Sequence, residues 1–244
     1  MPRLVKNILD QVSTALSDEE RVHWSRAELL TYFNEALREI AGLRPDTFVK
    51  RATLNLTAGA MQTLPSPYLD VVLVNGNLDE NGDATSQVLT KTQSTAGDRL
   101  GGKYSCASAT SYDGVQSYEI VSASHGYFKV EPPVPEGVTV RIDAMVYVPP
   151  PEFTEDQIGQ KNCVVPCMYD AQIVDWIMKR AYEKDTESQW SRDRAAYHFS
   201  AFRLGMNADY RAASRLRSGY ILGEKGTGVE TTGWRNETRG VFDA

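Results

Sequence analysis

A strongly bounded helix near the amino terminus is the feature that most constrains how this chain can fold. Residues 24–45 read WSRAELLTYFNEALREIAGLRP. Ser25 is a good N-cap, and Glu28 stands three residues later, as a capping box requires. Gly42 and Pro45 predict the end of the helix, because glycine readily adopts a left-handed backbone and proline cannot continue a helix. One apolar face at helical spacing is formed by Leu29, Phe33, Ala36, Leu37 and Ile40.

This helix needs partners, because an isolated helix of its length gains too little to offset the ordering of its backbone. Apolar residues at helical spacing predict a preceding helix over residues 4–16, joined to it by the polar turn SDEER. Two helices joined by so short a turn are expected to form an antiparallel hairpin. The remaining partners must come from elsewhere in the chain.

Between residues 46 and 155 the apolar pattern changes to a period of two, which is typical of strands. Strands are predicted at 52–56, 68–74, 115–121, 126–130 and 138–148. The clearest is the last, in which one face consists of Val138, Val140, Ile142, Ala144, Val146 and Val148. The polar region 75–114 is expected to hold short strands and long loops, and such loops are often functional.

Helical patterns return after Pro166, which suits the first turn of a helix. Residues 168–183 are apolar on more than one side, so this helix is expected to be central in its bundle. A longer helix is predicted over residues 187–217. Its predicted apolar stripe consists of Trp190, Arg194, Tyr197, Ala201, Leu204 and Ala208. At its end lie Arg211, Arg215 and Arg217, which either complement the negative end of the helix dipole or contact a partner.

The predicted fold class is therefore α+β: a discontinuous helical bundle with an inserted antiparallel β domain and an extended C-terminal tail. Residues 1–45 are the first segment of the helical domain, 46–155 the inserted β domain, 156–218 the second segment of the helical domain, and 219–244 the tail. The tail is rich in glycine and has no amphipathic period, yet it contains a few spaced apolar residues. These are Tyr220, Ile221, Trp234 and Phe242.

Composition excludes several classes of protein. The 26 basic and 32 acidic residues give a net charge of −6, which argues against a domain that binds the DNA backbone. No apolar run is long enough to span a membrane, and charged residues interrupt the amino terminus, so we expect cytoplasmic synthesis without export. The charge is uneven: residues 176–217 carry nine Lys/Arg and five Asp/Glu. This basic stretch is either a solvated helix face or a surface for an acidic partner.

The sequence offers no catalytic or metal-binding pattern. Glycine-rich phosphate loops, nucleophile elbows and zinc-protease patterns are all missing, and GEKGTG at 223–228 lacks the GK[ST] ending that a P-loop requires. Cys163, Cys167 and His198 are too few for a structural zinc site. The loop Asp79–Asp83 partly resembles a calcium loop, although a solvated hairpin tip explains it better. We therefore predict no enzyme activity, no catalytic residues, no cofactor and no metal.

Four stretches, in this order and spacing, resemble the head-to-tail adaptor (connector) proteins of tailed bacteriophages, in particular those of short-tailed phages. The stretches are WSRAELLTYFNEALREIAGLRPDTF, LTAGAMQTLPSPYLDVVLVNGN, FKVEPPVPEGVTVRIDAMVYVPP and VDWIMKRAYEKDTESQW…RAAYHFSAFRLG. Together they cover most of residues 20–208. The order of all four carries the resemblance, since none is diagnostic alone.

The resemblance implies a structural virion protein at the head–tail junction. Such proteins form a homo-oligomeric ring, commonly of twelve copies, between the portal protein and the tail nozzle or another tail protein. DNA passes through the lumen without specific binding, and the ring is the platform for tail assembly. An extended C-terminal tail clasps the portal. In this chain we expect portal contacts at Tyr220, Ile221, Trp234, Arg235 and Phe242.

Two other functions compete with the adaptor. The β domain could instead be a tail-associated binding module for a carbohydrate or host-surface ligand, with Tyr104, Tyr112 and Tyr118 as candidate contacts. A virion hydrolase is the third possibility, and it would require a converging catalytic set that the spacing of the residues does not suggest.

Overall fold

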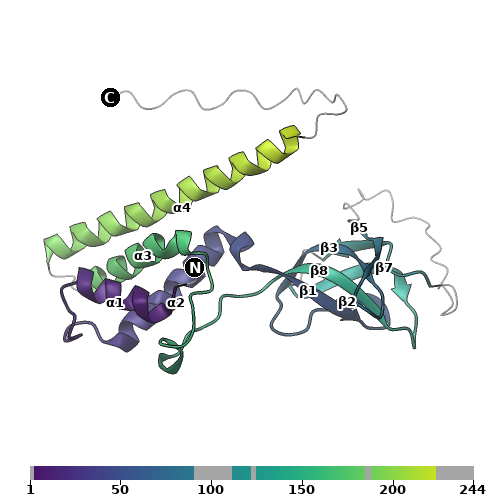
Figure 1. Cartoon of the computed structure of the whole chain (residues 1–244), viewed down its shortest axis with the longest axis horizontal. Helices are drawn as coiled ribbons and strands as arrows, with labels where there is room; N and C mark the ends of the chain where they lie inside the picture. The colour runs from purple at the N-terminus through teal and green to yellow at the C-terminus, as the bar shows by residue number, and fades with distance from the viewer. Residues whose placement is uncertain (1–2, 91–111, 122–124, 185–187, 224–244) are drawn as a thin grey trace. The chain divides into compact units, whose positions relative to one another are not determined.

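The computed structural model describes residues 3–90, 112–121, 125–184 and 188–223 (Figure 1). The helices are α1 (Val5–Ala15), α2 (Arg26–Leu43), α3 (Asp170–Glu183) and α4 (Gln189–Gly223), with short 3-10 helices at Pro45–Phe48, Glu155–Gln157 and Cys167–Tyr169. The strands are β1 (Val49–Leu56), β2 (Gly59–Thr63), β3 (Asp70–Leu78), β4 (Ala84–Gln87), β5 (Leu89–Thr90), β6 (Ser117–Ile120), β7 (Tyr127–Val134) and β8 (Val140–Tyr147). The chain divides into two compact units, Met1–Met206 and Asn207–Ala244, so the boundary falls inside α4.

Helix α2 begins as its capping residues predict. The Oγ of Ser25 accepts the backbone N–H of Glu28 at 3.2 Å, and Ser25 itself is extended. The Glu28 carboxylate accepts the hydroxyl of Tyr32 at 2.9 Å and the Nζ of Lys184 at 2.8 Å. Because Lys184 follows α3, the first turn of α2 is also tied to the end of α3.

The end of α2 differs from the prediction at Gly42. Gly42 lies inside the helix, which continues to Leu43. The break falls at Arg44, whose φ of −136° and ψ of 68° are outside the helical region. A residue before proline is disfavoured in the helical conformation, so Pro45 alone ends the helix and no left-handed glycine is required.

Residues from all four helices form one buried apolar cluster. In Figure 1, α3 lies between the first half of α4 and the pair α1 and α2. Fully buried members are Val5, Ile8, Leu9, Val12, Phe33, Leu37, Ile40, Ile173 and Ile177. Phe202 and Met206 of α4 belong to the same cluster, and the ring of Phe202 lies 5.0 Å from that of Trp176. Helices that precede and follow the strands in sequence therefore share apolar contacts.

The strands form two four-stranded sheets, ordered β1-β8-β3-β4 and β2-β7-β6-β5. Strand β8 pairs antiparallel with β1 on one side and with β3 on the other, and Ile142 stands opposite Leu54. The pairing of β5 with β6 is parallel, so the β domain is not wholly antiparallel as predicted. The chain between residues 90 and 117 is long enough for the crossover that a parallel pair requires.

The β sheets enclose a second apolar cluster. The predicted face of β8 is confirmed at Val140, Ile142, Ala144 and Val146, which are all buried. From the other sheet, Tyr118, Phe128 and Val130 belong to the same cluster. Alternation along β8 thus places one face of the strand in the core, as packing between two sheets requires. The α+β class is confirmed.

Candidate functional site

The residues predicted to contact partners lie on the second half of α4 and beyond it. Helix α4 carries Arg211, Arg215, Arg217, Tyr220 and Ile221, and the side chain of Arg211 is exposed. Outside the described residues lie Trp234, Arg235, Phe242 and Tyr104. The portal clasp therefore stays a prediction.

The end of α4 corrects two expectations. The helix continues to Gly223, so Tyr220 and Ile221 lie on its last turn rather than in an extended segment. The residues after 211 are mostly Ala, Arg, Ser and Leu, which tolerate a helix well, and a single Gly219 does not stop it. No basic residue is in the last turn, so the helix dipole does not explain Arg215 or Arg217.

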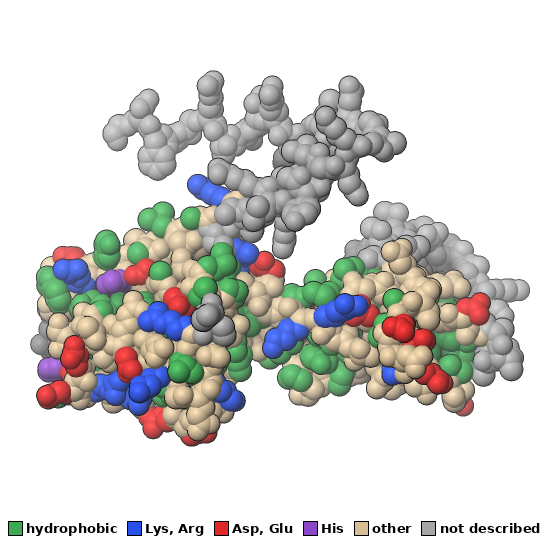
Figure 2. Space-filling model, viewed as in Figure 1, with side chains coloured by type: hydrophobic (Ala, Val, Ile, Leu, Met, Phe, Trp, Pro, Cys, Tyr) green, Lys and Arg blue, Asp and Glu red, His purple; other side chains and the backbone are tan. Residues whose placement is uncertain are grey.

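The predicted apolar stripe of α4 faces solvent. Trp190, Tyr197 and Leu204 are 58%, 63% and 69% exposed, whereas Phe202 and Met206 are buried. The helix is thus rotated by roughly a third of a turn from the predicted orientation. The physical reason is Trp176 of α3, which packs against Phe202 and selects that side of α4. Hydrophobic side chains consequently lie at the surface over α4 (Figure 2).

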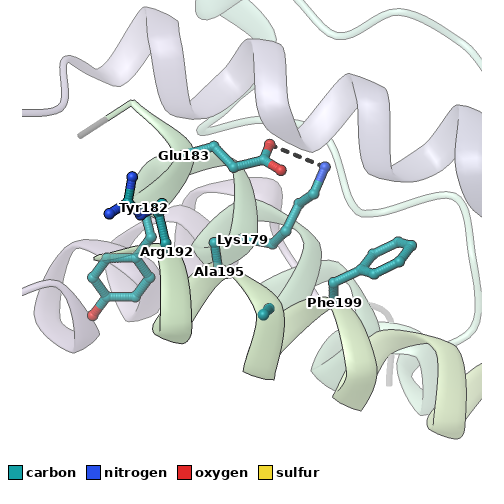
Figure 3. A pocket seen from close by; sticks show the side chains of 7 residues that line it. Lys179, Tyr182, Glu183, Arg192, Ala195 and Phe199 are labelled. Atoms are coloured by element: carbon teal, nitrogen blue, oxygen red, sulfur yellow. Dashed lines mark ion pairs between the residues drawn. The ribbon is translucent and has the colours of Figure 1, made fainter. Parts of the chain in front are cut away.

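A groove between α3 and α4 has a volume of about 390 Å³. Figure 3 shows Tyr182 at one end and Phe199 at the other, with Lys179 and Glu183 paired at 3.0 Å. A second groove, of about 500 Å³, is lined by His23, Trp24, Tyr182 and Trp190 among others. Tyr182 lines both grooves. Aromatic and basic side chains therefore dominate this region of the helical surface.

His198 holds α4 against α3. Its Nδ1 lies 2.8 Å from the Asp175 carboxylate, and its ring stacks on Tyr182 with centroids 5.9 Å apart. The pair is half-buried at the helix–helix contact. This arrangement orients α4, and it presents no reactive group to solvent.

The turn between α1 and α2 is more strongly built than a solvated loop. Ser17 and Arg21 have φ values of 54° and 58°, a left-handed conformation that is rare outside glycine. The buried Asp18 carboxylate accepts the N–H groups of Val22, His23 and Trp24 at 2.8, 3.0 and 2.8 Å. We call residues 17–22 the acidic loop. Asp18 fixes its backbone, while Glu19 and Glu20 are exposed and Val22 is 75% exposed.

Asp18 makes this loop sensitive to acid. Burial opposes its ionisation, but the N–H groups of Trp24, Val22 and His23 outweigh burial and hold the pKa of Asp18 below the ordinary value of 3.8. A carboxyl whose pKa is lower in the folded state stabilises the fold above its unfolded pKa, and the contribution is lost as pH falls through the folded pKa.

We therefore expect Asp18→Asn to lower the melting temperature most above about pH 5, with the difference from wild type shrinking as the pH falls through the lowered pKa of Asp18. Thermal unfolding at a series of pH values measures this. Glu19→Gln is the matched control and should show little difference at any pH. A difference for Asp18→Asn that does not change with pH would contradict the assigned role of the carboxylate.

The β domain gives little support to a carbohydrate site at the tyrosines. Tyr118 lies on β6 and is 2% exposed, so it belongs to the core. Tyr112 is half-buried against the same core, and burial raises its pKa. These two rings are therefore not displayed for stacking on a sugar.

Among the described residues, no group of three or more His, Cys, Asp or Glu is placed to hold a metal ion. Burial raises the pKa of the Cys163 thiol to about 11, as expected for an apolar cysteine. At the β3–β4 turn, the Asp79 carboxylate accepts the N–H groups of Asn81 and Asp83 at 2.9 and 2.8 Å. The loop thus has the hydrogen bonds of a hairpin tip.

No helix in the described regions of the chain is long and apolar enough to cross a membrane.

The described part of the chain combines a helical apolar cluster with two sheets, and large apolar side chains are exposed on α4. The sequence model of the SU10 adaptor protein family matches residues 4–221, and the chain belongs to this family of phage head–tail adaptor proteins. The predicted resemblance is confirmed at the level of the family. The family is structural and is not a family of enzymes. No curated protein matches the sequence.

Proposed function

We propose that this chain forms a ring between the portal and the tail nozzle of a phage particle, where it completes the DNA channel and serves as the platform for tail assembly. The observation that carries the proposal is the family match over residues 4–221. A virion component of an adaptor family must meet head and tail proteins. Twelve copies are the expected number, and the net charge of −6 suits a channel that does not retain DNA.

Within that ring, the helical segments 1–45 and 156–218 act as one discontinuous body, and residues 46–155 form the inserted β domain. The shared apolar cluster of α1, α2, α3 and α4 supports this division. The segment 219–244 clasps the portal through Tyr220, Ile221, Trp234, Arg235 and Phe242. A few aromatic anchors can supply most of the affinity of such a contact. Arg211, Arg215 and Arg217 add a basic surface for the same partner.

The test mixes the protein with the portal of the same phage and follows complex formation by mass photometry and electron microscopy. We expect a ring on the portal for wild type. Replacing residues 224–244 with a Gly/Ser segment of equal length should weaken portal binding at least about tenfold, because the anchors are lost. The matched control is Met61→Ser, an exposed apolar residue of the β domain. Equal portal binding by the replaced chain would rule out portal contacts by Trp234, Arg235 and Phe242.

A further inference from the structure

The exposed side of α4 has the composition of a protein interface. Trp190, Tyr197 and Leu204 recur every seven residues, and Arg194 lies on the same side, one turn after Trp190. We call these four residues the α4 surface. The Arg194 guanidinium lies 5.2 Å from the centroid of the Trp190 ring. Aromatic residues and arginine are enriched where proteins bind one another, and charged residues other than arginine are depleted.

The α4 helix is also fastened to α3. On the side of the helix that faces α3, Phe202 packs against Trp176, and His198 pairs with Asp175. A helix with three large apolar side chains more than half exposed is an unfavourable arrangement in water unless a partner covers it. A partner can bind such a preformed surface without first ordering it.

The acidic loop is complementary to the α4 surface in charge, and it also exposes an apolar side chain. It displays two carboxylates, Glu19 and Glu20, beside Val22, the most exposed of the large apolar side chains that the structure describes. Two left-handed residues and the three hydrogen bonds to Asp18 fix its shape. Backbone strain of this kind persists only where surrounding contacts enforce it, and it concentrates at functional sites.

We propose that the acidic loop of one copy of the chain docks on the α4 surface of the next copy. Glu19 and Glu20 would face Arg194, and Val22 would pack beside Tyr197 and Leu204. The exposed Asp193 on the adjoining side of α4 accepts a hydrogen bond from Gln189 at 2.9 Å. The two surfaces are different, so the contact is heterologous, and a heterologous contact closes into a ring when its rotation divides a full turn. The inference rests on the proposed ring and names the contact that builds it.

The test uses the full chain, alone and with the portal, and measures the concentration at half-assembly by mass photometry. Arg194→Glu and Glu20→Arg should each raise this concentration at least about tenfold, since each puts like charges together. The double variant Arg194→Glu/Glu20→Arg should recover most of the loss, because the swapped charges attract again. Tyr197→Glu should also weaken assembly about tenfold or more. The matched control is Arg203→Glu, exposed on the other side of α4, which should assemble like wild type.

The outcomes separate the inference from the proposed function. If wild type never forms a ring, alone or on the portal, the proposed function fails and the inference fails with it. If wild type forms rings and the Arg194, Glu20 and Tyr197 variants assemble equally well, only the inference is overturned. Single variants that weaken assembly without recovery in the double variant would overturn the pairing of the acidic loop with the α4 surface.

Discussion

Replacing Asn34 with alanine is expected to lower the free energy of unfolding by about 2–5 kcal/mol, because two buried backbone groups lose their partners. The Asn34 side chain is buried on α2. Its Nδ2 donates to the carbonyl of Phe153 at 2.9 Å, and its Oδ1 accepts the N–H of Phe153 at 2.9 Å. This bridge spans 119 residues of sequence and fastens the segment that follows β8 to α2.

Urea unfolding followed by tryptophan fluorescence measures the effect. All four tryptophans lie outside residues 46–155, so the signal reports on the chain outside the β domain. The matched control is Asn7→Ala, the same change at an exposed position of α1, for which we expect a change within about 0.5 kcal/mol. Asn34→Asp should be at least as damaging as Asn34→Ala, because a carboxylate cannot donate to the Phe153 carbonyl. Equal stability of Asn34→Ala and Asn7→Ala would show that the bridge contributes nothing.

Local signals in the sequence predicted the features that depend on neighbouring residues. The start of α2 follows from Ser25 and Glu28, and the buried face of β8 follows from strict alternation. Gly42 was the wrong stop signal because Pro45 already excludes a helical Arg44. In both regions the deciding interactions lie within a few residues, so the pattern alone contains them.

Features that depend on distant residues were not predictable in the same way. Helix α4 has aromatic residues on two sides, Trp190 and Tyr197 on one and Phe202 on the other. Contacts with α3, from Trp176 to Phe202 and from Asp175 to His198, decide between them. No residue near Asn34 in the sequence indicates that its side chain binds the backbone of Phe153, which lies 119 residues away. The polar sequence SDEER was read only as a turn, so the ordered backbone of the acidic loop was not predicted. An aspartate at the start of a turn is nevertheless a familiar acceptor for backbone N–H groups. That preference is the signal that could have revealed it.

The second large effect is expected for Trp176→Ala, which should lower the free energy of unfolding by about 3–5 kcal/mol through the cavity that it leaves. Trp176 is 7% exposed, and its ring lies 5.0 Å from that of Phe202 and 6.4 Å from that of Phe199. Its loss removes the contact that orients α4 on α3. We therefore expect faster tryptic cleavage after Arg194 and Arg203, which the packed helix protects.

The matched control is Trp190→Ala, the same substitution at an exposed tryptophan of α4. Trp190 is 58% exposed and touches Tyr182 edge to face at 5.5 Å, so Trp190→Ala should cost less than about 1 kcal/mol in unfolding. It should instead raise the concentration at half-assembly, because Trp190 belongs to the α4 surface. The two tryptophans thus separate the packing of α4 from its binding. If Trp190→Ala destabilised the chain as much as Trp176→Ala, the side of α4 that faces α3 would be wrongly assigned and the α4 surface would not be free to bind a neighbour.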